Sequence, residues 1–134
     1  MWIIDTNVVV SALISKKTDN PPRRIIQKML KGEIIFWLSH QLFEEYRQVL
    51  HRPTIRKLHH LTDAELESIL TTLKLNARWY EPPDIDYFAP DRGDNHLWAL
   101  LKNIPNTGLV TGDKLLQENP PMSIQVISPH HFIT

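Results

Sequence analysis

The stretch that decides the expected fold is Trp2-Ile3-Ile4-Asp5-Thr6-Asn7-Val8. Its first three residues form a short apolar run that stops abruptly at Asp5, a pattern typical of a strand buried on both faces. The apolar residues from Val8 to Ile14 then predict a helix that is apolar nearly all round. A buried strand followed at once by a helix indicates an α/β protein with Asp5 at the end of its first strand.

Short apolar runs and helical patterns alternate along the rest of the chain. The strand-like runs lie at 34–38, 109–111 and 124–127. Helices are expected over about 21–31, 40–52, 63–73 and 94–102, with Pro53 breaking or kinking the second of these. This alternation predicts a parallel sheet covered by helices on both faces. The length of 134 residues fits a single domain over residues 1–134.

The composition excludes several classes of protein. Adding the 4 glycines to the 42% hydrophobic residues gives about 45% apolar residues, and 22% are charged, which is ordinary for a globular protein. The absence of cysteine excludes disulfide scaffolds and thiolate zinc sites, and it suits a cytoplasmic location. The chain opens without basic residues and with a carboxylate after three apolar ones, so we expect no signal peptide.

The net charge of zero hides a segregation of charge along the chain. Residues 16–31 hold six basic side chains against one acid, and residues 47–60 hold four and no acid. Residues 81–94 reverse the sign, with five acids, Asp84 and Asp86 among them, against Arg92. Basic segments beside an acidic one are compatible with a polyanionic substrate drawn to a metal-holding pocket, although solvated helix faces would give the same pattern.

Two carboxylates are expected to meet at one edge of the sheet. Asp5 follows the first strand directly, and Asp113 follows the strand at 109–111. Ligands of open parallel sheets bind at the carboxyl ends of strands. Each residue alone could instead be a helix cap or a turn residue. Together they would repel each other unless they share a cation.

The helix at 40–52 adds a third acid, which helical geometry selects. The centre of its apolar stripe lies near Tyr46. At 100° per residue, Glu45 lies about 100° from that centre and Glu44 about 160° away. We therefore expect Glu45 in a half-buried pocket and Glu44 facing water, while a border position on a solvated face remains open for Glu45.

The segment Asp91-Arg92-Gly93-Asp94-Asn95 carries the strongest local signal. Asp94 lies at the top of the buried stripe of the helix that follows, so it is either a partner of the helix dipole or a metal ligand. Asp91 is a weaker candidate for the same site. A set of carboxylates suggests Mg²⁺ or Mn²⁺ and phosphoryl chemistry, whereas the scattered histidines are interpreted as surface or core residues.

Four motifs follow one another along the chain: Asp5-Thr6-Asn7-Val8, Glu45 to Leu50, Asp91-x-x-Asp94-Asn95 and Thr111-Gly112-Asp113-Lys114. In this order and spacing they resemble the PIN-domain nucleases over about residues 2–133, and within them the prokaryotic VapC-type toxins of toxin–antitoxin pairs. The resemblance implies a three-layer α/β/α sandwich with a parallel sheet of about five strands. It also implies Mg²⁺- or Mn²⁺-dependent hydrolysis of single-stranded RNA by a cytoplasmic endoribonuclease.

The resemblance assigns roles to particular residues. Asp5, Glu45, Asp94 and Asp113 take the positions of the catalytic acids, with Asp5, Asp94 and Asp113 holding the metal. Asn7, Thr111 and Asp91 take supporting positions. Many members carry a further acid where this chain has Leu115, which leaves the number of metal ions open.

The resemblance also implies partners: an RNA substrate, a cognate antitoxin and a second copy of the chain in a homodimer. The basic segments supply the candidate RNA-binding residues, which are Arg23, Arg24, Lys28, Arg47, Arg52 and Lys114. Two alternatives remain open, a catalytically weak RNA-binding or regulatory protein with the same fold and a housekeeping nuclease for RNA processing or repair.

Overall fold

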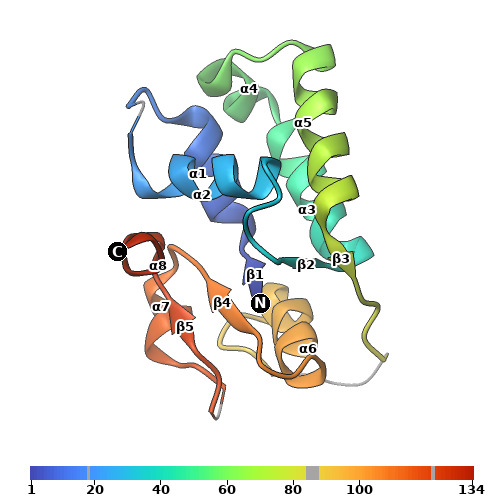
Figure 1. Cartoon of the computed structure of the whole chain (residues 1–134), viewed down its shortest axis with the longest axis vertical. Coiled ribbons are helices and arrows are strands. Elements are labelled where there is room, and N and C mark those ends of the chain that lie inside the picture. Colours follow the sequence, from blue (N-terminus) through green and yellow to red (C-terminus); the bar gives the residue numbers. More distant parts are fainter. Residues whose placement is uncertain (18, 84–87, 122) are drawn as a thin grey trace.

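Short parallel strands form the centre of the computed structural model, which describes residues 1–17, 19–83, 88–121 and 123–134 (Figure 1). β1 (Trp2–Ile4) pairs with β4 (Gly108–Val110), and β4 pairs with β5 (Val126–Ile127). β2 (Trp37–Leu38) pairs with β3 (Arg78–Trp79). Asp84 and Asp86 of the acidic segment lie outside the described residues.

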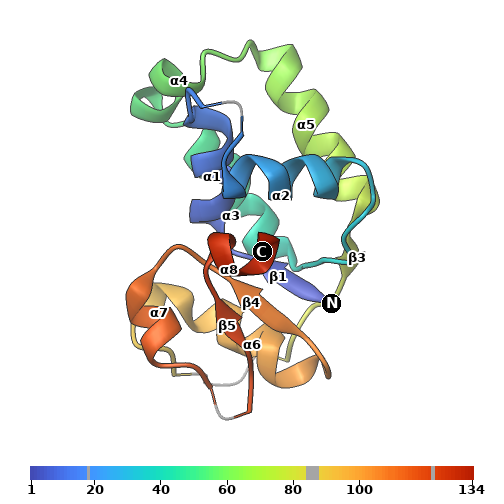
Figure 2. The same cartoon turned by 60° about the vertical axis from the view of Figure 1, so that its left-hand side comes forward.

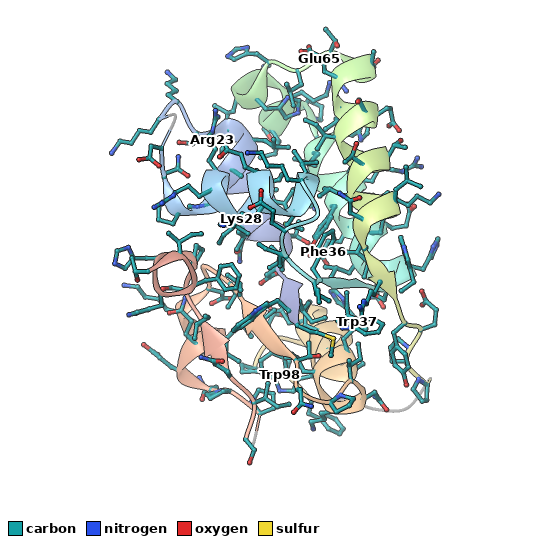
Figure 3. All side chains as sticks on the ribbon, viewed as in Figure 1. Arg23, Lys28, Phe36, Trp37, Glu65 and Trp98 are labelled. Carbon is teal, nitrogen blue, oxygen red and sulfur yellow. The ribbon has the colours of Figure 1, made fainter. Side chains whose placement is uncertain are left out.

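A single bridge joins the two sets of strands. Trp2 pairs with Phe36, and the Trp2 amide donates a hydrogen bond to the carbonyl of Ile35 over 3.0 Å. The strands of the described residues therefore follow the order β3-β2-β1-β4-β5, with every pairing parallel. Phe36 is fully buried near the middle of the molecule (Figure 3).

Helices cover the strands on two sides. Their bounds are α1 (Thr6–Ile14), α2 (Pro21–Leu30), α3 (His40–Leu50), α4 (Pro53–His59), α5 (Asp63–Asn76), the 3₁₀ helix η1 (Arg92–Asp94), α6 (Asn95–Asn103), α7 (Lys114–Glu118) and α8 (Pro129–Ile133). In both views, α1 to α5 gather on one side of β1, and α6 and α7 lie on the other (Figures 1 and 2). This is the α/β architecture that the sequence predicts.

Local sequence signals explain where several helices begin. The side chain of Asn20 caps α2 by accepting from the Arg23 amide, and Ser39 caps α3 by accepting from the Leu42 amide. Thr62 opens α5 through a capping box. No helix in the described parts of the chain is long and apolar enough to cross a membrane.

The structure corrects the expected helix over 40–52. α3 ends at Leu50, two residues before the expected end, so the helix is broken before Pro53, as one of the two alternatives predicted, and Pro53 begins a separate helix, α4. Proline fits the first turn of a helix because its missing N–H has no partner there in any case. The short elements β3, α7 and α8 were not predicted, because two to five residues are too few to show a hydrophobic period.

Tyr46 fixes α3 against the first strand. Its ring is fully buried, and its hydroxyl donates a hydrogen bond of 2.5 Å to the carbonyl of Ile4 at the end of β1. Burial raises the pKa of Tyr46 well above its usual value, so the hydroxyl keeps its proton. Tyr46 follows Glu45 in the sequence, and Ile4 precedes Asp5. This hydrogen bond therefore keeps the segment with Glu45 close to the segment with Asp5.

Replacing Tyr46 by Phe removes this hydroxyl and leaves the Ile4 carbonyl without its donor. We expect the free energy of unfolding to fall by about 1–2 kcal/mol, the usual cost of an unmatched buried polar group. Urea denaturation of both proteins measures the difference. Tyr80→Phe is the matched control, since the Tyr80 hydroxyl makes no hydrogen bond with the described residues. Equal stability of Tyr46→Phe and wild type would contradict the expectation.

Candidate functional site

Asp5 and Asp113 lie at the same edge of the sheet, as the strand order requires. Asp5 directly follows β1, and the sequence Thr111-Gly112-Asp113 directly follows β4, its parallel neighbour. The Thr111 hydroxyl donates to Oδ2 of Asp5 over 2.7 Å and accepts from the amide of Asp113 over 3.1 Å. One threonine side chain thus connects the two aspartates.

Asn7 reinforces the same junction. Its side-chain amide donates to Oδ2 of Asp5 and to the Thr111 hydroxyl, both over 3.2 Å. Its carbonyl oxygen accepts from the amide of Gly112 over 2.9 Å. Asn7 and Thr111, the supporting residues predicted from the motifs, therefore both contact Asp5.

Glu45 reaches the site from α3. Its Oε1 accepts from the hydroxyl of Thr6 over 2.5 Å, and its Oε2 lies 3.0 Å from Nε2 of His96 on α6. Glu45 therefore contacts the residue that follows Asp5 and a residue that lies two positions after Asp94.

Glu44 differs from Glu45 in its partners and not in its exposure. The two side chains are 33% and 34% exposed, so the expectation that Glu44 alone would face water was wrong. Glu44 bends back along its own helix and lies 3.7 Å from Arg47, whereas Glu45 points to Thr6 and His96. The two glutamates are thus distinguished by their partners, Arg47 for Glu44 and Thr6 and His96 for Glu45.

The capping alternative applies to some of the acids and not to others. Asp5 accepts from the amide of Thr6 over 2.8 Å, Asp91 from Gly93 over 2.9 Å and Asp113 from Leu115 over 2.9 Å. These three are helix caps, and Asp5 and Asp113 also lie at the edge of the sheet. Asp94 precedes α6, but its carboxylate makes no cap hydrogen bond and accepts none from any described residue.

The carboxylates act on one another electrostatically. Burial and, after it, the charges of Asp5, Asp91, Asp113 and Glu45 in that order together raise the pKa of Asp94 to about 6. Burial also raises the pKa of Asp5, against the opposing hydrogen bonds from Thr111 and the Thr6 amide. The negative charges of the four other acids thus all disfavour the ionised form of Asp94.

Glu45 is shifted in the opposite direction. Burial alone would raise its pKa, but the hydrogen bonds from His96 and Thr6 and the charges of His96 and Arg52 hold the pKa below its usual value. Glu45 is therefore ionised at neutral pH.

The donor set fits a hard divalent cation in its chemistry. Carboxylate oxygens are the preferred ligands of Mg²⁺ and Mn²⁺, and Asp94 offers a carboxylate with no competing hydrogen bond from the described residues. Within the same described ranges, no three His, Asp or Glu side chains already converge as a ligand set. Binding a cation would therefore require these side chains to close around it.

Two contacting residues were missed from the sequence. Thr6 lies inside the first motif, yet only the fold shows that its hydroxyl reaches Glu45. His96 was interpreted with the other histidines as a surface or core residue, but it bonds to Glu45. Its place on the first turn of a helix that begins beside Asp94 was the available signal.

The six predicted RNA-binding residues do not form one cluster. The guanidinium of Arg23 (Figure 3) donates to the carbonyl of Ser15, the C-cap of α1, which lies about 15 Å along the helix axis from Asp5. Three other residues of this set form ion pairs, which are Arg24–Asp19, Lys28–Glu33 and Arg47–Glu44. Arg52 acts on the charge of Glu45, and Lys114 directly follows Asp113.

The protein is of the α/β class, with an acidic site where the parallel strands β1 and β4 end. Comparison with protein families matches residues 2–115 to the PIN domain, so this chain belongs to the PIN-domain family. Membership of this family supports a nuclease-type hydrolase function, and PIN domains generally depend on divalent metal ions. A comparison with curated proteins gave no match.

The raised pKa of Asp94 makes the stability of the metal-free protein depend on pH. A group whose pKa is higher in the folded state disfavours folding once it ionises, so stability is lost as pH rises from about 4 to about 6. Asp94→Asn removes that charge and keeps the volume. In EDTA at pH 7, we expect this variant to unfold with a free energy about 1 kcal/mol above that of the wild type.

The gain should disappear near pH 4, where the wild-type carboxyl is protonated, and denaturant titrations at the two pH values measure it. Asp5→Asn is the contrasting variant: burial also raises the pKa of Asp5, but its carboxylate accepts three hydrogen bonds that an amide cannot all accept, so this variant should be less stable than Asp94→Asn. A metal-free Asp94→Asn protein less stable than the wild type at pH 7 would contradict this account.

Proposed function

We propose that this protein is an endoribonuclease that hydrolyses phosphodiester bonds of single-stranded RNA with Mg²⁺ or Mn²⁺. The observation that carries the proposal is Asp94, which has no hydrogen-bond donor among the described residues and lies in the field of four further acids. Such an uncompensated carboxylate suits a bound cation better than a purely structural role. Membership of the PIN-domain family supports the nuclease class.

In this proposal, Asp5, Asp94 and Asp113 hold the metal ion. When bound, the ion supplies positive charge that offsets the phosphate and makes water a better nucleophile. Asn7 and Thr111 keep the Asp5 carboxylate in place through the hydrogen bonds described above. Glu45 and Asp94 orient the attacking water, Glu45 accepts the proton that the water gives up, and Asp91 supports the turn that carries Asp94.

RNA contacts are proposed for the six basic residues in two groups. Arg52 and Lys114 are suited to phosphates beside the site, given their positions near Glu45 and Asp113. Contacts to phosphates further along the strand are assigned to Arg23, Arg24, Lys28 and Arg47. Exposed ion pairs such as Arg24–Asp19 contribute little stability, so these cations can be released for a phosphate.

The two neighbouring glutamates of α3 provide a matched test. Glu45→Gln should reduce the rate of Mn²⁺-dependent cleavage of single-stranded RNA by about 100-fold or more, because the amide cannot accept the proton from water. Glu44→Gln, which alters an equally exposed side chain paired with Arg47, should retain the wild-type rate.

The rates are measured on a labelled RNA with Mn²⁺ and with EDTA, and Asp94→Asn serves as the inactive reference. Cleavage that persists in EDTA would contradict the metal dependence. The reverse ranking of the two glutamates would exclude Glu45 from the reaction.

We propose further that the nuclease is the toxin of a toxin–antitoxin pair and works as a homodimer with a cognate antitoxin protein as its inhibitor. The resemblance of its motifs to VapC-type toxins supports this role. Induced expression of the wild type in a bacterial host should arrest growth, and expression of Asp94→Asn should not. Equal growth of both cultures at equal protein levels would favour a housekeeping nuclease or a catalytically weak RNA-binding protein.

A further inference from the structure

His96 is a buried side chain that the proposed chemistry does not yet use. It lies on the first turn of α6, and its imidazole is 4% exposed. Nε2 lies 3.0 Å from Oε2 of Glu45. Nδ1 is also buried and has no hydrogen-bond partner in the described part of the chain.

The direction of the bond to Glu45 follows from the chemistry of the two groups. An ionised carboxylate can only accept, so Nε2 must carry the hydrogen and donate it. Thr6 donates to the other oxygen, Oε1. One donor thus holds each oxygen of Glu45, and each oxygen keeps a further lone pair for a water molecule in the site.

A purely structural role explains the imidazole poorly. A leucine would fill a similar volume at this position without a buried nitrogen that lacks a partner. The unmatched Nδ1 makes the imidazole a destabilising choice for packing alone. Its one hydrogen bond goes to a glutamate of the proposed site.

The contact also connects two walls of the site. Glu45 lies on α3, and His96 lies on α6, which begins immediately after Asp94. α3 and α6 pack against each other, and the Glu45–His96 bond lies between them. The distance from the Glu45 carboxylate to Asp94 is therefore set in part through His96.

We propose that His96 is a positioning residue, which holds the Glu45 carboxylate through its Nε2–H so that Glu45 and Asp94 face the same water molecule. The inference rests on the proposed nuclease function. It assigns to His96 no contact with RNA, water or metal ion.

Two substitutions separate positioning from packing. His96→Leu removes the donor and the unmatched nitrogen, so kcat should fall by about 10- to 100-fold, as is usual when a supporting hydrogen bond is lost. KM for RNA should stay within about twofold, and Tm should not fall. His96→Gln can donate from a nearby position and should recover most of the lost rate.

His51→Leu is the matched control, because His51 pairs with Glu67 over 3.5 Å near the end of α3 and makes no contact with Glu45. It should leave kcat unchanged. In a Glu45→Gln background, His96→Leu should cause no further loss of rate, since the two residues act as one unit.

Each outcome of this comparison has a definite meaning. An active wild type with an equally active His96→Leu variant overturns the positioning role and leaves the proposed function standing. A His96→Gln variant as slow as His96→Leu, or a His96→Leu variant with a lowered Tm and a rate loss that persists without Glu45, also overturns it. A wild type that cleaves no RNA with either metal overturns the proposed function and this inference together.

Discussion

The parallel pairing of β1 with β4 is the constraint on which the site depends. Its register places Ile4 opposite Val110, so the next residue of each strand, Asp5 and Thr111, meet at the edge and form a hydrogen bond. Asp113 follows two residues later, and its amide also bonds to Thr111. If one strand slipped by one residue, Asp5 would no longer lie opposite Thr111, and the side chains of that strand would turn to the other face of the sheet.

The fold supports this acidic edge by unequal means. Asp5 receives three hydrogen bonds, and Glu45 receives one from Thr6 and one from His96. Asp94 receives none from the described residues, and burial together with the neighbouring acids raises its pKa to about 6. The hydrogen bonds lower the pKa of Glu45, whereas the pKa of Asp5 and of Asp94 is raised, and the absence of a donor among the described residues makes Asp94 the position where a cation would gain most. The charge of Asp94 lowers the stability of the metal-free protein, and the same charge would favour the binding of a cation.

Much of the fold was readable from the sequence because its signals are local. The apolar run before Asp5, the caps Asn20, Ser39 and Thr62 and the helical phase of α3 each depend on a few neighbouring residues. Contacts between distant segments were not readable, as the bond between Glu45 and His96 shows: 51 residues separate them. The break before Pro53 was predicted, but the helix that begins there was not, because proline both ends and begins helices.

The central claim is that the carboxylates at the strand ends hold a divalent cation, and diffraction from crystals grown with Mn²⁺ tests it most directly. Anomalous scattering at the manganese edge locates the ion without reference to activity. The account predicts a peak bounded by oxygen atoms of Asp5, Asp94 and Asp113 at the edge formed by β1 and β4, and its loss in Asp94→Asn crystals. A well-ordered edge with no such peak, or a peak that persists unchanged in Asp94→Asn, would contradict it.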